Sequence, residues 1–162
     1  MEKIHSLTGM IDLIGHKTSK EDISERIFYA EEILRDIFES YSISEIRTPA
    51  LESSNLFKRS VGDASDIVNK ELYSFLDKNE KSITLRPEGT ASVIRSVIEK
   101  KLDNDTHKLW YLGPMWRYER PQKGRYRQFN QAGIEILGYP EGLAELEIIS
   151  IICSINKALG IE

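Results

Sequence analysis

The residues best suited to chemistry lie in residues 107–128, a basic segment of an otherwise acidic chain. It holds six bases and a single acid: Lys108, Arg117, Arg120, Lys123, Arg125, Arg127 and Glu119. Aromatic residues interleave with them: Trp110, Tyr111, Trp116, Tyr118, Tyr126 and, just beyond, Phe129. Cationic donors beside flat rings suit a nucleotide ligand. A solvated surface loop would explain the charges alone.

One face of the strand expected after this segment is also suited to a ligand. Because side chains alternate along a strand, a single face carries Arg127, Phe129, Gln131, Gly133 and Glu135. At about 3.3 Å per residue, the last four span roughly 20 Å, the length of a nucleotide joined to a small second substrate. Gly133 would let a ligand lie close. An ordinary solvent-exposed sheet face is the alternative interpretation.

Neither common glycine-rich phosphate cradle, Gly-x-Gly-x-x-Gly or Gly-x-x-x-x-Gly-Lys, occurs in the sequence. If ATP binds, its phosphates must therefore be met by side chains. Lys123 and Arg125, nearest the expected turn, could reach a bent triphosphate, and the planar fork of Arg117 could hold one phosphate.

The elements that must position these residues begin with a long amphipathic helix. Ser19 and Asp22 resemble a capping box, and apolar residues then recur at helical spacing from Ile23 to Tyr41. Residues 45–51 are expected to form a short strand with Pro49 near its end, and because proline cannot donate to a ladder, it favours a sheet edge or a strand boundary. The next segments, 72–76 and 82–85, flank a polar turn at 77–81 and predict a β-hairpin.

The second half of the chain predicts two helices and two longer strands. Pro87 is expected to start a helix that buries Ala91, Ile94, Val97 and Ile98. Residues 108–119 and 127–137 are strand-like, with Ile134 and Ile136 on an apolar face that can pack on helices. A last helix spans 143–159 and ends at Gly160. Short connections between strands predict an α+β fold on an antiparallel sheet flanked by helices.

Composition excludes several classes of protein. The chain of 162 residues is 40% hydrophobic and has a net charge of −4, so it is not a general polyanion binder. Its one cysteine, Cys153, excludes an internal disulfide, and the three histidines do not fall at metal-ligand spacing. The most apolar stretch is too short to span a membrane. We expect one cytoplasmic domain with no metal site of its own.

Three stretches of the sequence carry a family resemblance: residues 56–62 (LFKRSVG), 85–90 (LRPEGT) and 117–129 (RYERPQKGRYRQF). In order and spacing they closely resemble the histidyl-tRNA synthetases, which are class II aminoacyl-tRNA synthetases. The resemblance covers nearly the whole chain and implies the class II catalytic-domain fold. It also implies that the first helix and the strand with Pro49 form motif 1 and the interface of a homodimer.

The same resemblance implies an ATP site on motif 2, the two longer strands and their basic loop. Arg117 would contact the α-phosphate, Arg125 the outer phosphates, and Glu119 the adenine amino group, while Phe129 stacks on adenine. These roles agree with the residue types, because a guanidinium binds phosphate, a carboxylate accepts from an amino group and a phenyl ring stacks on adenine. Mg²⁺ would accompany ATP.

Histidine would lie at the other end of this face. The resemblance implies that Glu88, Thr90 and Gln131 hold its amino group and that Glu135 faces its imidazole. It also counts Gly89 and Arg117 among the histidine-binding residues. For Glu88, stabilisation of a helix N-terminus is an alternative role that can coexist. The implied reaction joins histidine to the α-phosphorus of ATP, expels pyrophosphate, and passes the adenylate to the histidine tRNA.

The chain departs from the family pattern in its extent. Residues 1–162 correspond to the N-terminal part of a catalytic domain, without motif 3 and the anticodon-binding domain, so we expect the fragment to be weakly active or inactive alone. An incomplete sheet would also favour self-association. Two alternatives are a histidine-binding regulatory subunit of ATP phosphoribosyltransferase and a bare dimerisation module; the first commonly lacks the motif 2 residues that are intact here.

Overall fold

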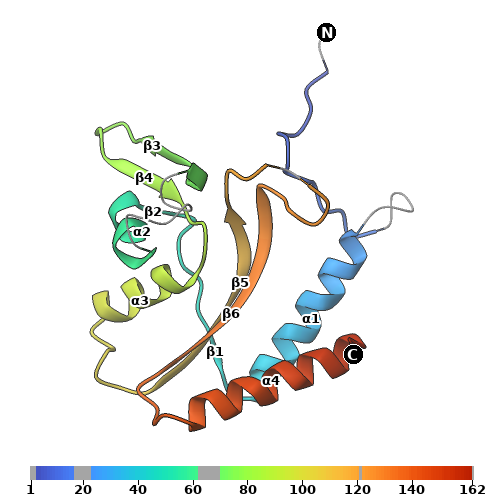
Figure 1. The fold of residues 1–162 in the computed structure, drawn as a ribbon, viewed down its shortest axis with the longest axis vertical. Coiled ribbons are helices and arrows are strands. Elements are labelled where there is room, and N and C mark those ends of the chain that lie inside the picture. Colours follow the sequence, from blue (N-terminus) through green and yellow to red (C-terminus); the bar gives the residue numbers. More distant parts are fainter. Residues whose placement is uncertain (1–2, 17–22, 62–69, 121, 162) are drawn as a thin grey trace. The chain divides into compact units, whose positions relative to one another are not determined.

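The computed structural model describes residues 3–16, 23–61, 70–120 and 122–161. Its elements follow in the order α1 (Ser24–Ser40), β1 (Ser44–Glu45), β2 (Leu51–Ser53), α2 (Ser54–Val61), β3 (Ser74–Leu76), β4 (Ser82–Leu85), α3 (Thr90–Glu99), β5 (His107–Trp116), β6 (Gln128–Leu137) and α4 (Leu143–Leu159) (Figure 1). The chain divides into two compact units, and β5 and β6 contribute residues to both.

The first unit contains residues 1–11, 47–102 and 112–133. Strands β2, β4 and β3 form an antiparallel sheet in that order, in which Leu85 is opposite Leu51 and Ser82 is opposite Leu76. Helix α2 contacts this sheet and helix α3. Fully buried apolar side chains form its core: Phe57, Val93 and Met115. The unit therefore holds both the residue 85–90 segment and the basic segment from Arg117 to Phe129.

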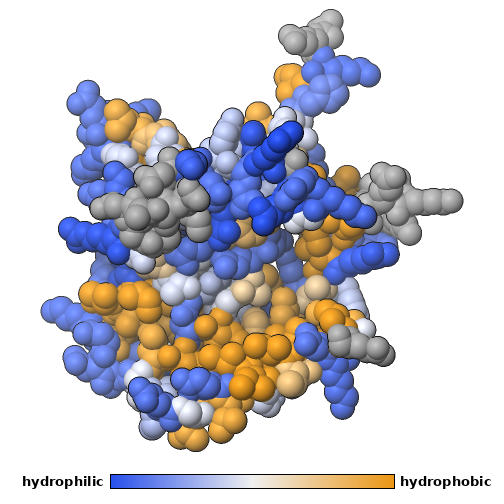
Figure 2. All heavy atoms as spheres, viewed as in Figure 1, coloured by the Kyte–Doolittle hydropathy of each residue, from blue (hydrophilic) through white to orange (hydrophobic). Residues whose placement is uncertain are grey.

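The second unit contains residues 12–46, 103–111 and 134–162. In it α1 packs on α4, β1 pairs in parallel with β5, and Phe38 contacts Trp110 with ring centroids 5.2 Å apart. Helix α4 also carries exposed apolar residues, at Leu143, Leu146, Ile149 and Ile152. Hydrophobic side chains gather over α4 in the space-filling view (Figure 2).

Several sequence predictions are confirmed. The α+β class is correct, the hairpin of β3 and β4 forms around the 77–81 turn, and α4 spans Leu143–Leu159. Gly160 ends α4 with a left-handed φ of 66°, as a glycine C-cap should. Helix α1 forms as expected, while the capping box at Ser19 and Asp22 lies outside the described residues.

Other boundaries were wrong, for local reasons. Residues 45–51 do not form one strand: β1 and β2 flank a loop that contains Pro49, which cannot donate to a ladder, and they join different sheets. Helix α3 begins at Thr90 rather than Pro87, and Ile98 is 60% exposed instead of buried. Strand β5 ends at Trp116, so Arg117 and Glu119 lie beyond it.

Candidate functional site

Arg117 is held in a fixed orientation directly after β5. Its backbone N–H donates to the carbonyl oxygen of Arg127 at 2.9 Å, and its side-chain Nε donates to the carbonyl oxygen of Pro87 at 2.9 Å. The guanidinium carbon lies 5.1 Å from the centroid of the Phe129 ring. Within the described residues, its two terminal nitrogens have no hydrogen-bond partner. A preoriented fork with two available NH₂ groups suits a phosphate or a carboxylate.

Glu119 and Arg125 contact each other across the loop. Arg125 Nη1 lies 3.3 Å from Glu119 Oε2, with the Arg125 side chain 66% exposed and that of Glu119 18% exposed. The loop turns at Gly124, whose φ is +78°. Because an ion pair with so exposed a partner contributes at most about 1 kcal/mol, adenine and phosphate groups could separate the two side chains at little cost.

Gln131 follows Phe129 on the same face of β6 and presents an unsatisfied acceptor. Its Oε1 atom is buried and has no hydrogen-bond partner within the described residues. An unpaired buried acceptor is costly, and a ligand that carries N–H donors would relieve that cost. Ser92 Oγ and Arg95 Nε are also buried without a partner among the described residues, but Gln131 is the one that the sequence predicts to face the ligand.

Glu135 lies four residues further along β6 and belongs to the second unit. Its side chain is half-buried and interacts with other described residues. Its contact with an imidazole stays a prediction, as does the close approach of a ligand at Gly133.

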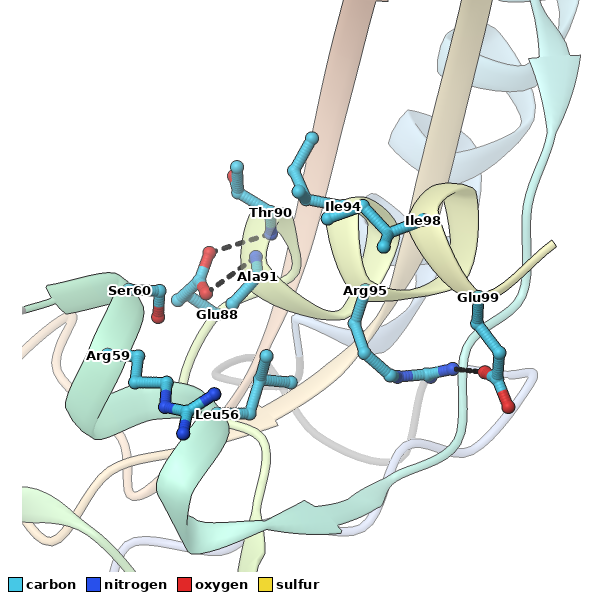
Figure 3. A pocket seen from close by; sticks show the side chains of 10 residues that line it. All are labelled: Leu56, Arg59, Ser60, Glu88, Thr90, Ala91, Ile94, Arg95, Ile98 and Glu99. Carbon is cyan, nitrogen blue, oxygen red and sulfur yellow. Dashed lines mark hydrogen bonds and ion pairs between the residues drawn. The ribbon is translucent and has the colours of Figure 1, made fainter. Parts of the chain in front are cut away.

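Glu88 caps helix α3 with both carboxylate oxygens. Oε2 accepts the backbone N–H of Thr90 at 2.6 Å and Oε1 that of Ala91 at 2.9 Å (Figure 3). Gly89 is the buried residue before the helix, and Thr90 is its first residue. The helix-capping role expected from the sequence is therefore present, and the side chain bends back outside the helix, which explains why α3 starts three residues after Pro87.

A groove of about 770 Å³ lies between α2 and α3. Its lining is largely apolar, with charged groups at the margins: Leu56, Arg59, Ser60, Glu88, Thr90, Ala91, Ile94, Arg95, Ile98 and Glu99 (Figure 3). None of the motif 2 residues lines it. The structure thus clusters Arg117, Glu119, Arg125 and Phe129, and links them to residues 88–90 through the bond between Arg117 and Pro87.

Sequence analysis missed the role of Arg86, which is only 9% exposed. Its Nη1 donates to the carbonyl oxygen of Thr48 at 2.8 Å and its Nε to that of Pro114 at 3.1 Å. A Cβ on Gly113 would come within 2.9 Å of Arg86 Nη2, so that glycine makes room for the guanidinium. The signal in the sequence was a charged residue between apolar Leu85 and Pro87. Such a residue is expected to be buried with its strand, and a buried cation needs hydrogen-bond acceptors.

The described residues hold no group of three or more histidine, cysteine, aspartate or glutamate side chains that could bind a metal ion. Likewise, no helix in the described ranges has the length and apolar character needed to cross a bilayer.

Comparison with known sequences gives one consistent result. Residues 17–162 match the sequence profile of the family described as histidyl-tRNA synthetase. A histidine–tRNA ligase of Synechococcus sp. strain RCC307 is 48% identical over 162 residues, which cover 99% of this chain and 38% of that protein. The one from Geobacter sulfurreducens is 51% identical over 139 residues, or 85% of this chain and 34% of that protein.

Solved structures agree with the sequence matches. The apo histidyl-tRNA synthetase of S. aureus superposes with a TM-score of 0.75 at 38% identity, over 96% of this chain and 35% of that one. A Bacillus halodurans C protein described as an ATP phosphoribosyltransferase regulatory subunit/histidyl-tRNA synthetase reaches 0.76 at 23% identity, over 99% and 40% respectively, which shows a shared fold.

Proposed function

Because the chain belongs to the histidyl-tRNA synthetase family, we propose that its parent protein is a cytoplasmic histidine–tRNA ligase. Such an enzyme activates histidine with ATP and transfers it to the histidine tRNA. The chain spans little more than a third of the length of the curated relatives it matches. Residues 1–162 would be the N-terminal part of the catalytic domain, with motif 3 and the anticodon-binding domain outside it.

The observation that carries the proposal is the geometry of Arg117. Its Nε is committed to Pro87 and its ring-stacked guanidinium leaves two NH₂ groups for a ligand. In adenylate formation the histidine carboxylate attacks the α-phosphorus while pyrophosphate leaves. Negative charge spreads over the phosphoryl oxygens in that transition state, and a preoriented cationic fork stabilises it without reorganisation.

The adenine end would use Phe129, Glu119 and Arg125. Since Arg117 lies over the Phe129 ring, adenine must stack on the part of the ring that the guanidinium does not cover. Glu119 would accept the adenine amino group, and Arg125, released from Glu119, would reach the outer phosphates. Mg²⁺ would enter on the ATP phosphates and neutralise their charge, as is usual for this ion.

The histidine end would use the orphaned acceptor of Gln131 for the amino group, with Glu88, Gly89 and Thr90 beside it and Glu135 at the imidazole. An ammonium group would satisfy the buried Gln131 Oε1. Both Glu88 oxygens already accept backbone N–H groups, but each carboxylate oxygen has a second lone pair available for the ligand.

We also propose that the parent is a homodimer. The exposed apolar residues of α4 support this, because a contact between subunits would remove them from water. A histidine-binding regulatory subunit of ATP phosphoribosyltransferase is the second candidate, favoured by the fold shared with the Bacillus halodurans C protein. The presence of Arg117, Glu119, Arg125 and Phe129 together favours the ligase.

Histidine-dependent exchange of pyrophosphate into ATP by the full-length parent tests the proposal. Arg117→Ala should lower the exchange rate by about 10²- to 10³-fold, the effect of removing one preorganised charge-stabilising donor. Lys78→Ala, an exposed base in the β3–β4 turn, is the matched control and should exchange normally. The 162-residue chain should exchange far more slowly than the parent. Normal exchange by Arg117→Ala would refute the assigned role, and a parent with no exchange would refute the ligase.

A further inference from the structure

The N-terminal segment contacts motif 2 through Gly9. The carbonyl oxygen of Gly9 accepts the backbone N–H of Arg127 at 2.7 Å and that of Gln128 at 3.2 Å. Gly9 itself lies in a turn, in which the N–H of Met10 donates to the carbonyl oxygen of Leu7 at 2.9 Å. Gly9 has a φ of +79°, in the left-handed region. One carbonyl group thus holds two successive amides at the start of β6.

Both the space and the backbone conformation at Gly9 disfavour a side chain. A Cβ on Gly9 would lie 2.9 Å from Arg127 Cγ and 3.1 Å from its backbone nitrogen. Either distance forces a shift of the neighbouring atoms, and one of those atoms is backbone. An L-residue would also be strained at this φ.

Arg127 transmits this contact to the proposed ATP-binding residues. Its carbonyl oxygen accepts the N–H of Arg117 at 2.9 Å, and its Nε donates to the carbonyl oxygen of Glu119 at 3.2 Å. Its guanidinium carbon lies 4.0 Å from the centroid of the Tyr118 ring. Arg127 therefore touches three successive residues, 117–119, two of which we assign to ATP.

We propose that Gly9 is a positioning residue for motif 2: its carbonyl pins the backbone of Arg127, and Arg127 in turn sets the position of Arg117 and Glu119. The effect of Gly9 on ATP binding rests on the proposed function, whereas its effect on the position of the motif 2 backbone does not. No atom of Gly9 needs to touch a substrate for this role.

Site-resolved amide hydrogen exchange on the 162-residue chain tests the pinning. In Gly9→Ala the amides of Arg117, Arg127 and Gln128 should exchange about tenfold faster, because the strained contact opens more often. The control is Gly15→Ala, since Gly15 has no left-handed φ and no atom near the site of a new Cβ. Unchanged exchange at the three amides would overturn the proposal, and so would equal acceleration throughout the first unit, which would mean a general loss of stability.

A chain that starts at Met10 keeps the test decisive if Gly9→Ala does not fold. It lacks the Gly9 carbonyl, and the same three amides must again exchange faster while the amides of the β3–β4 hairpin keep their rates. If these three amides exchange as slowly as they do in the intact chain, the N-terminal segment does not hold the motif 2 backbone.

ATP titration by calorimetry tests the second step. Gly9→Ala should bind ATP about tenfold more weakly than the unmodified parent, with Gly15→Ala unchanged. Normal ATP affinity together with faster exchange at the three amides would refute the link to Arg117. These titrations use the full-length parent with and without each substitution. A parent that binds no ATP counts against the proposed function, and the exchange measurement still decides whether Gly9 holds the backbone of Arg127 and Gln128.

Discussion

At the scale of single residues, the site is built from groups whose own partners already fix their orientation. Arg117 donates its Nε–H to the Pro87 carbonyl oxygen, which leaves its terminal nitrogens for a ligand. Each carboxylate oxygen of Glu88 accepts one backbone N–H at the start of α3. Gln131 is the exception, because its buried oxygen has no partner within the described residues. Function and stability should therefore conflict at Gln131 more than at its neighbours.

Replacement of Gln131 should separate stability from histidine binding. Gln131→Met removes the orphaned oxygen at similar volume, so the free energy of unfolding should stay constant or rise by up to about 1 kcal/mol. Affinity of the parent for histidine should fall at least about tenfold, since a hydrogen bond to a charged amino group is lost. Chemical denaturation and histidine titration measure the two effects.

Gln128→Met is the matched control in the same strand. Gln128 Oε1 accepts the indole N–H of Trp116 at 3.2 Å, so this change should cost about 1 kcal/mol of stability and leave histidine affinity unchanged. A clear loss of stability in Gln131→Met would mean that its oxygen is satisfied in solution.

The residue types of the site could be predicted from sequence, whereas their partners could not. Alternation along β6 placed Phe129 and Gln131 on one face, and the pairing of Arg117 with Phe129 agrees with that. Nothing in the spacing indicated that Arg117 would bond to Pro87, or that Gly9 would contact Arg127, because both contacts join segments far apart in sequence. Alternation of side chains predicts which residues share a face of a strand, whereas their hydrogen-bond partners depend on tertiary contacts.

At the scale of elements, predictions succeeded where strong local signals mark both ends. The polar turn between β3 and β4 and the glycine after α4 gave boundaries close to those observed. The segment around Pro49 lacked such signals, and its short strands pair with different sheets. Two- and three-residue strands owe their existence to their neighbours, so sequence alone predicts them poorly.

The hydroxyl group of Tyr41, directly after α1, makes hydrogen bonds with two serines of α4, and its pKa is lowered. Tyr41 Oη lies 2.8 Å from Ser150 Oγ and 3.0 Å from Ser154 Oγ, and these hydrogen bonds, the one with Ser150 foremost, lower the Tyr41 pKa from its ordinary value of 10.0. A phenol with a lowered pKa in the folded state stabilises the fold above the unfolded pKa, and that contribution is lost as pH falls through the folded value.

We therefore expect the Tyr41 phenol to ionise at a lower pH than a free tyrosine side chain does. Ultraviolet absorbance of phenolate should show this early phase, Tyr41→Phe should abolish it, and Ser150→Ala should move it to higher pH. Tyr29→Phe, an exposed tyrosine of α1, should leave it in place. An early phase that survives Tyr41→Phe would contradict the assignment.

At the scale of the whole molecule, the surface of α4 predicts association. Leu143, Leu146, Ile149 and Ile152 are 59%, 66%, 57% and 49% exposed. Each lies about one turn from the next, so they form a row that winds around α4. Hydrophobic side chains gather over this helix in Figure 2. Sequence analysis expected an apolar face from the incomplete sheet. Helix α4 carries further exposed apolar residues, which that expectation did not include.

Sedimentation equilibrium should therefore show self-association of the 162-residue chain at high concentration. Ile149→Lys should weaken it by at least about tenfold, since a lysine there must bring its charge into the contact. Ile98→Lys, at an equally exposed isoleucine of α3, should have no effect. A chain that remains monomeric at high concentration would show that α4 alone does not drive association.

The hydrogen bond from Arg117 to the carbonyl of Pro87 has a thermodynamic consequence for the parent enzyme. A phosphate that binds the Arg117 guanidinium should change the strength of its hydrogen bond to the Pro87 carbonyl oxygen. A ligand that binds Glu88 should change the same hydrogen bond, because Glu88 directly follows Pro87. We expect two binding events that act on this one bond to be coupled, and a coupling between binding free energies is reciprocal. Histidine and ATP should thus change each other's dissociation constant by one common factor, whichever is added first.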